Sequence, residues 1–329
     1  MSNKLRRSRF FPLFALQLVC LFLIGCSTVF AADKYAFILP SLANPYWKAL
    51  SEGITDGAKE VGITPVILTS TNDAAKEEVL NICQAAISQK PSIIMVCTTT
   101  TPIAIKCLQE IQKNGIKSAI LDAILTVNDA KKSGVKLSFS IGTNNVMVGQ
   151  KGADFLVKQT KLKAPKILII EGLAGNENSK NRVSGFKGEI AKSLPSAKIV
   201  SSVSADWDRL KAITITADTL TRNPDLNVVF AANDMMALGA VEAIRSAGKT
   251  KDVVVIGVDG VSDARKAILA GRMTASVAQL PYLIGKRSVT LAAESVHGKC
   301  SEKTETTPLV VLTKETLESQ KEPLLKYVR

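Results

Sequence analysis

The stretch FAANDMMALG at residues 230–239 decides the fold, together with VVVIGVDG at 253–260 and SVAQLP at 276–281. Each stretch begins with the apolar residues of a buried strand and then places one polar residue where the strand should end: Asn233, Asp259 and Gln279. In an open parallel sheet, helices cover both faces, so a ligand can approach only the edge formed by the carboxyl ends of the strands. The three polar side chains therefore predict a binding site at such an edge.

The alternation of apolar runs and helical patterns continues from residue 35 to the end of the chain. Apolar runs predict strands at 35–39, 64–68, 93–97, 118–121, 137–141, 166–171, 198–203, 227–231, 253–257, 273–278 and 309–312. Between most of them, apolar residues recur at the spacing of an amphipathic helix. This order predicts an α/β protein with parallel sheets covered on both faces. Roughly a dozen strands exceed one ordinary sheet, so we expect two doubly wound lobes.

Two helix boundaries can be identified directly. Asn44 precedes Pro45, which predicts a side-chain N-cap followed by proline at the first helical position. We likewise interpret Asp234 as only a helix N-cap. The segment AIRSAGKT at 243–250 imitates a phosphate-binding loop, but Ala243 stands in place of the first glycine and the segment ends a helix. We therefore interpret Gly248 as a helix C-cap.

Residues 1–33 have the order of an export leader. An apolar run at 10–24 is too short for a typical membrane span, and it follows four basic residues: Lys4, Arg6, Arg7 and Arg9. Leu23-Ile24-Gly25-Cys26 resembles the lipobox of bacterial lipoproteins, which makes Cys26 a lipidation candidate, whereas Val29-Phe30-Ala31 resembles an ordinary signal-peptidase site. Both processing routes stay open. Either one predicts a protein of the periplasm or cell envelope, attached to a membrane only if Cys26 carries a lipid.

Composition excludes several classes of function. The chain has 329 residues and a formal charge of +13, but its basic residues are scattered among acids, which indicates a solvated surface rather than a nucleic-acid site. No C-x-x-C spacing connects the cysteines that follow the leader, which argues against a metal site: Cys83, Cys97, Cys107 and Cys300. One disulfide among them is compatible with export, and the sequence leaves its pairing open.

Motifs for catalysis are missing from the sequence. There is one histidine, His297, and no G-x-S-x-G turn accompanies it. No G-x-G-x-x-G follows the first predicted strand, so no dinucleotide cradle is expected. We expect no cofactor and no enzymatic activity; an enzyme on the same fold is the alternative of a different class, and formation of a product from the bound ligand would favour it.

The polar strand ends suit a polyol. Sugar hydroxyls both donate and accept hydrogen bonds, and the C–H face of a sugar packs on aromatic rings. Candidate partners for the hydroxyls are Asn44, Asp122, Arg182, Asn233, Asp259 and Gln279, and candidate ring contacts are Tyr46, Trp47 and Trp207. The structural alternatives are that Asn44 is only a helix cap, that Trp207 packs between lobes and that Arg182 forms a surface ion pair.

Eight segments in this order resemble the periplasmic sugar-binding proteins of bacterial ABC transporters, of the ribose and allose type, from Lys34 to about Leu317. They are SLANPYW (41–47), ILD (120–122), IEGLAGN (170–176), NRVSGF (181–186), SADWDRLKA (204–212), AANDMMALGA (231–240), GVDG (257–260) and VAQLP (277–281). NPYW and ADWDR make the chain more similar to the allose-type members. The resemblance implies two lobes joined by three crossovers, residues 34–142 with 280–307 and residues 143–279 with 308–329.

By position, the resemblance assigns Asn44, Tyr46, Trp47 and Asp122 to one lobe, and Arg182, Trp207, Asn233, Asp259 and Gln279 to the other lobe and the hinge. Three positions depart from the family pattern. Pro40 stands where allose-type proteins have a lysine, Ala123 where ribose-type proteins have an arginine, and Cys97 where these have an asparagine. Three polar contacts are lost, so the identity of the sugar stays open.

The resemblance implies a function in import. A monomer would capture a monosaccharide between its lobes and deliver it to the permease of an ABC transporter. The alternative is an exported sensor that presents a sugar or a furanosyl signal to a membrane receptor or kinase.

Overall fold

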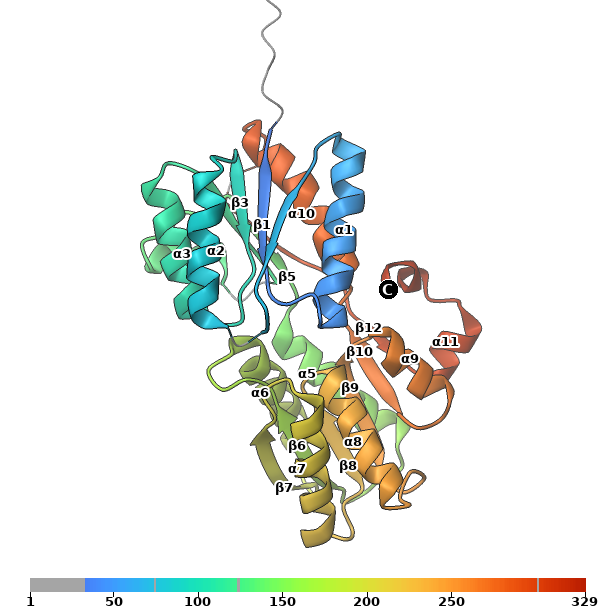
Figure 1. Cartoon of the computed structure of the whole chain (residues 1–329). Coiled ribbons are helices and arrows are strands. Elements are labelled where there is room, and N and C mark those ends of the chain that lie inside the picture. Colours follow the sequence, from blue (N-terminus) through green and yellow to red (C-terminus); the bar gives the residue numbers. More distant parts are fainter. Residues whose placement is uncertain (1–32, 74, 123–124, 301) are drawn as a thin grey trace, which may run out of the picture. The chain divides into compact units, whose positions relative to one another are not determined.

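The protein is described by a computed structural model that covers residues 33–73, 75–122, 125–300 and 302–329 (Figure 1). The lipidation candidate Cys26, the rest of the predicted leader before residue 33, and Ala123 lie outside the described residues. Within them, no helix combines the length and the apolar character that crossing a membrane would require.

The first sheet contains six of the described strands, in the order β11-β5-β4-β3-β1-β2, and each neighbouring pair is parallel. Its strands are β1 (Tyr35–Leu39), β2 (Val66–Thr69), β3 (Ile93–Val96), β4 (Lys117–Leu121), β5 (Phe139–Gly142) and β11 (Lys303–Thr306). Its helices are α1 (Pro45–Val61), α2 (Lys76–Ser88), α3 (Thr101–Lys113), α4 (Val127–Lys132) and α10 (Pro281–Val296). We call this sheet and these helices the N-terminal lobe.

The second sheet also contains six described strands, in the order β12-β10-β9-β8-β6-β7, and only β12 is antiparallel to its neighbour. Its strands are β6 (Lys166–Glu171), β7 (Lys198–Ser204), β8 (Val228–Ala231), β9 (Val254–Asp259), β10 (Ala275–Ala278) and β12 (Val310–Leu312). Its helices are α5 (Asn145–Gln159), α6 (Glu177–Ser193), α7 (Arg209–Arg222), α8 (Asp234–Ser246), α9 (Ser262–Leu269), α11 (Lys314–Ser319) and the 3₁₀ helix η1 (Pro323–Tyr327). These elements form the C-terminal lobe.

The sequence of β1 shows why the strands are almost wholly apolar. Tyr35, Phe37 and Leu39 pack against α1 and α10, whereas Ala36 and Ile38 point to the opposite face and pack against α2 and α3. Alternate side chains of a strand point to opposite faces, and here helices bury both. Figure 1 shows these two helix pairs on the two sides of β1.

The chain passes between the two sheets three times, after β5, after β10 and after β11. The expected fold class, two doubly wound lobes joined by three crossovers, is thereby confirmed. One strand, β11, was not predicted because its sequence KTET contains no apolar residue and lies mostly exposed at the edge of its sheet.

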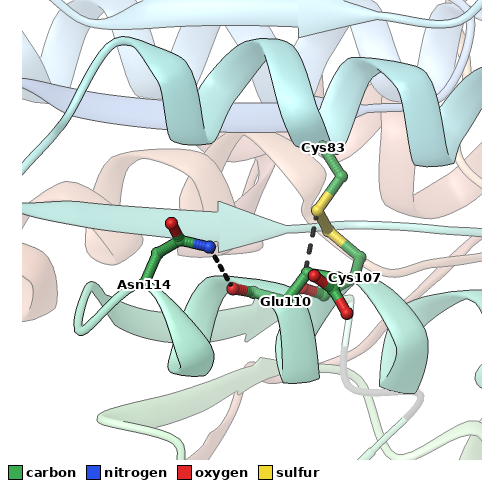
Figure 2. The surroundings of a disulfide bond; sticks show 4 residues. All are labelled: Cys83, Cys107, Glu110 and Asn114. Atoms are coloured by element: carbon green, nitrogen blue, oxygen red, sulfur yellow. Dashed lines mark hydrogen bonds between the residues drawn. A yellow bond between two sulfur atoms is a disulfide. The ribbon is translucent and has the colours of Figure 1, made fainter.

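A disulfide joins α2 to α3 in the core of the N-terminal lobe. The sulfur atoms of Cys83 and Cys107 are 2.09 Å apart (Figure 2). Cys97 and Cys300 are free; Cys97 is buried and Cys300 is partly exposed. This pairing is one of those that the sequence left open.

Candidate ligand-binding site

A pocket lies where the carboxyl ends of strands from both sheets meet. Eight of the nine predicted site residues line it: Asn44, Tyr46, Trp47, Asp122, Arg182, Trp207, Asn233 and Asp259. The ninth, Gln279, is fully buried behind the pocket. Of the three strand-end residues singled out from the sequence, Asn233 and Asp259 line the pocket and Gln279 does not.

Asn44 and Tyr46 are positioned by the start of α1. The Asn44 side chain caps the helix by accepting a hydrogen bond from the Tyr46 backbone N–H at 3.0 Å. This N-cap gives an acceptor to a backbone N–H that has no partner within the helix. Pro45 fixes the φ angle of the first helical residue. The Tyr46 hydroxyl then donates to Asp122 Oδ1 at 2.6 Å. The predicted cap is confirmed, and it coexists with a place on the pocket wall.

Asp122 lies directly after β4 and connects the lobes. Its Oδ2 accepts a hydrogen bond from the Asn178 side chain of α6 at 2.7 Å. Burial raises the pKa of Asp122, and its hydrogen bond from Tyr46 and the positive charge of Arg182 oppose that rise. The carboxylate is thus held by one donor from each lobe.

Arg182 is buried in α6 and is not a surface residue, so the surface ion-pair interpretation is wrong. Its guanidinium donates to Asn145 Oδ1 at 2.8 Å, to the Ala232 carbonyl at 2.7 Å and to Gln279 Oε1 at 2.9 Å. It also lies 3.5 Å from Asp259 Oδ1. A buried guanidinium needs acceptors in several directions, and four separate segments of the chain supply them here.

Asp259 is the last residue of β9 and forms a buried ion pair with Arg182. Gln279 donates to its Oδ1 at 2.6 Å, which fixes both the carboxylate and, through Arg182, the guanidinium. Burial raises the pKa of Asp259 well above its usual value, while Arg182 lowers it. The role of Gln279 in the structure is therefore to hold these two charged groups rather than to line the pocket.

A single hydrogen-bonded chain runs through both lobes. From Asp122 it continues to Asn178, whose Oδ1 accepts from Asn145 at 3.0 Å, and Asn145 in turn accepts from Arg182. Polar groups linked in this way fix one another's orientation. The two halves of the pocket are therefore positioned by the same network.

Asn233, and not Asp234, caps helix α8. The Asn233 side chain accepts from the Met236 N–H at 2.9 Å. Asp234 instead accepts from the Gly260 N–H at 2.7 Å, the Val261 N–H at 2.9 Å and the Ser276 hydroxyl at 2.7 Å. The interpretation of Asp234 as only a cap is wrong, because as the first helical residue it points at the turn after β9. Burial raises its pKa to about 7.

Trp207 lies in the turn between β7 and α7 and packs against the core of its own lobe. Its ring lies 5.7 Å from the Arg182 guanidinium, within cation–π range. Gly172 makes room for it, since a Cβ at that position would lie 2.2 Å from the indole. The ring therefore belongs both to the lobe core and to the pocket lining.

Three lining residues have a backbone in the left-handed region, where glycine is favoured. The φ angles are 66° for Asp122, 66° for Trp207 and 118° for Asp259. Non-glycine residues adopt such angles at a cost of about 1–3 kcal/mol each. The pocket is thus a place where the fold holds backbone strain.

Five lining residues were not predicted: Asp73, Thr98, Thr99, Asn176 and Asn178. Thr98 and Thr99 follow β3, so the strand-end rule that found Asn233 and Asp259 could have found them. Asn176 caps α6, as an Asn before a helix indicates.

Of the three positions that depart from the family pattern, Pro40 and Cys97 are buried and neither lines the pocket. Within the described residues, no three His, Cys, Asp or Glu side chains are grouped as a metal site would need.

Fold and pocket together define a two-lobed solute-binding protein. The family model of the periplasmic binding protein domain matches residues 35–300, and the chain belongs to that family. It is 35% identical to the D-allose-binding periplasmic protein of Escherichia coli K12, over 82% of this chain and 86% of that protein. It is 33% identical to the ribose import binding protein RbsB of Bacillus subtilis, over 83% of this chain and 85% of that protein.

A solved structure agrees with these relatives. The chain superposes with a TM-score of 0.81 on an ABC transporter periplasmic solute binding protein from Actinobacillus succinogenes with bound D-allose. The two are 29% identical, and the match covers 87% of this chain and 99% of the other. Family and fold are therefore established by sequence and by structure.

Proposed function

We propose that this protein captures a monosaccharide between its two lobes and delivers it to the permease of an ABC transporter. The observation that carries the proposal is the composition of the pocket: carboxylates, amides, a guanidinium and aromatic rings face one space from both lobes. This set matches what a polyol requires, hydrogen-bond partners of both kinds beside flat apolar faces. The relatives are named for allose and ribose, which supports the choice of ligand class.

The proposed mechanism is closure of the lobes around the sugar. Asp122 and Asn178, and likewise Thr99 and Asn176, bond across the two lobes at the pocket. A ligand that contacts both walls binds the closed arrangement better than an open one and shifts the population toward it. The closed form is then the signal that a permease in contact with both lobes would recognise.

The same proposal covers the cellular setting. The exported protein acts as a monomer in the periplasm or cell envelope, and a lipid on Cys26 would keep it near the permease. It catalyses no reaction on the bound sugar.

Intrinsic fluorescence tests the proposal, because the two tryptophans of the chain, Trp47 and Trp207, both line the pocket. The protein from residue 34 onward is titrated with pentoses, hexoses, inositols and furanosyl signal molecules. We expect a saturable change at micromolar concentration with one sugar, lost in Asp259→Ala and retained in the surface control Asp218→Asn. Absence of any response in a folded protein would refute the assignment to sugars.

A further inference from the structure

The carboxylate of Asp73, in the loop after β2, accepts three hydrogen bonds, from Ser41, Asn44 and Trp47. Its Oδ1 accepts from the Trp47 indole N–H at 3.0 Å and from the Ser41 backbone N–H at 3.2 Å. Its Oδ2 accepts from the Asn44 side-chain amide at 3.1 Å. Asp73 itself lines the pocket beside these residues. Two candidate sugar contacts, Trp47 and Asn44, are therefore fixed by one side chain.

None of these donors can reverse its role. An indole N–H and a backbone N–H only donate. The Asn44 amide could in principle be flipped, but its oxygen is committed to the Tyr46 N–H as the cap of α1, so its amino group must face residue 73. Residue 73 must consequently accept on both of its oxygens. A carboxylate does this, whereas an asparagine would present an N–H₂ group to one of the donors.

The loop is also tied to the neighbouring strand end. The Thr99 hydroxyl donates to the Asp73 carbonyl at 2.7 Å, and the Thr99 carbonyl accepts from Asn176 of the C-terminal lobe. The side chain and the backbone of Asp73 are thus both anchored where the lobes meet. Burial raises the pKa of Asp73, and the bonds from Asn44 and Trp47 oppose that rise.

We infer that Asp73 is a positioning residue for the ligand: it sets the plane of the Trp47 ring and the direction of the Asn44 amide toward the pocket. This inference rests on the proposed function, because the geometry it fixes is that of the sugar contacts. It adds a requirement that the predicted site residues do not contain: residue 73 must accept from Trp47 and Ser41, and residues 44 and 73 must form a matched donor–acceptor pair.

Two variants test this pairing. In Asp73→Asn, the new side-chain NH₂ group faces the NH₂ group of Asn44, and neither can accept a hydrogen bond from the other. The double variant Asn44→Asp/Asp73→Asn exchanges the roles: the new carboxylate at position 44 still caps α1 and accepts from the new amide at position 73, whose oxygen accepts from Trp47 and Ser41. Asp218→Asn, the same chemical change at an exposed site of α7, is the control.

The first measurement needs no ligand. The indole N–H resonance of Trp47 is followed by NMR and assigned with Trp207→Phe. We expect Asp73→Asn to move it upfield and the double variant to move it part of the way back, because an amide oxygen is a weaker acceptor than a carboxylate, while Asp218→Asn leaves it unchanged. If the Trp47 resonance is the same in Asp73→Asn and wild type, the inference is overturned whatever sugars bind.

The second measurement is affinity for the sugar that the fluorescence panel identifies. Losing one acceptor for buried donors should raise the Kd about 10- to 100-fold in Asp73→Asn. The double variant should recover to within about fivefold of wild type. An unchanged Kd in Asp73→Asn overturns the inference. If wild type binds no sugar while the Trp47 resonance responds as expected, the proposed function fails and the positioning of Trp47 by Asp73 stands.

Discussion

The two walls of the pocket are built from different chemistry. The C-terminal wall, Arg182, Trp207, Asn233 and Asp259, is organised around a guanidinium and a carboxylate 3.5 Å apart. The N-terminal wall, Asn44, Tyr46, Trp47, Asp73 and Asp122, holds two carboxylates that accept hydrogen bonds from neutral donors.

This difference indicates where specificity can change. Replacing either Arg182 or Asp259 would leave the other as an unpaired buried charge. The C-terminal wall should therefore tolerate little substitution at these two positions. Donors and acceptors of the N-terminal wall can be exchanged in pairs without creating an unpaired ion. The three departures from the family pattern, Pro40, Cys97 and Ala123, all follow strands of the N-terminal lobe. Pro40 and Cys97 are buried outside the pocket, so we expect the sugar preference to be set mainly by the lining residues of the N-terminal wall.

The largest effect expected from this comparison is that of Arg182→Ala. It leaves Asp259, Gln279 and the Ala232 carbonyl without their buried donor, which should lower the free energy of unfolding by about 3–5 kcal/mol and abolish sugar binding. Urea denaturation and fluorescence titration measure both. A loss below about 1 kcal/mol would contradict the ionic character of the C-terminal wall.

The N-terminal lobe alone carries a disulfide among the described residues. Cys83→Ser with Cys107→Ser opens a loop of 24 residues, for which we expect a loss of about 3 kcal/mol. Since the bond joins α2 and α3 and neither cysteine lines the pocket, the Kd should change less than about twofold. Differential scanning calorimetry and sugar titration provide the two readings. A large rise in Kd would mean that the helix pair shapes the N-terminal wall.

The C-terminal wall should also make stability depend on pH. The pKa of Asp234 behind it is about 7 in the folded protein, above the ordinary value of 3.8, because burial disfavours the charged form. Between these pH values the folded state holds a proton that the unfolded state releases. Stability should therefore fall as pH rises from about 5 to about 7, by on the order of 2 kcal/mol.

Chemical denaturation at several pH values tests this linkage. Asp234→Asn cannot titrate, so its unfolding free energy should have a flatter slope over the same range, even though the variant is less stable throughout. Equal slopes in the two proteins would show that Asp234 is ionised over the whole range.

The smallest effect concerns the aromatic part of the C-terminal wall. Trp207→Phe keeps a ring beside Arg182 but weakens the cation–π contact and leaves space against Gly172, for which we expect a cost of about 0.5–1 kcal/mol in binding. Isothermal titration calorimetry would show the Kd rising roughly two- to fivefold. Tyr46→Phe, which removes the hydroxyl bond to Asp122, serves as the matched change on the N-terminal wall.

The sequence predicted the pocket where polar residues end the strands. Asn233, Asp259 and Gln279 each interrupt an apolar run, so their location followed from the pattern. Asp73 lies in the polar loop STND, in which nothing distinguishes the side chain that turns inward. The disulfide pairing depends on how α2 and α3 are rotated against each other, and spacing carries no information on that.

The same limit explains the error at Asp234. A cap and the residue after it are chemically alike in Asn233-Asp234, and only the position of the turn at Gly260 decides which side chain bonds the helix. The strand β11 was missed for a related reason, since an exposed edge strand needs no apolar residue.

The left-handed backbone at Asp122, Trp207 and Asp259 has a consequence for how this protein can be altered. Glycine at position 259 would relax the main chain and at the same time delete the carboxylate beside Arg182. That deletion would leave Arg182 as an unpaired buried charge, at a cost larger than the backbone strain it relieves, so selection for heat resistance alone should keep Asp259. A thermostability library scored without a binding assay should therefore retain the carboxylate at position 259, because the same ion pair serves both the stability of the fold and the pocket.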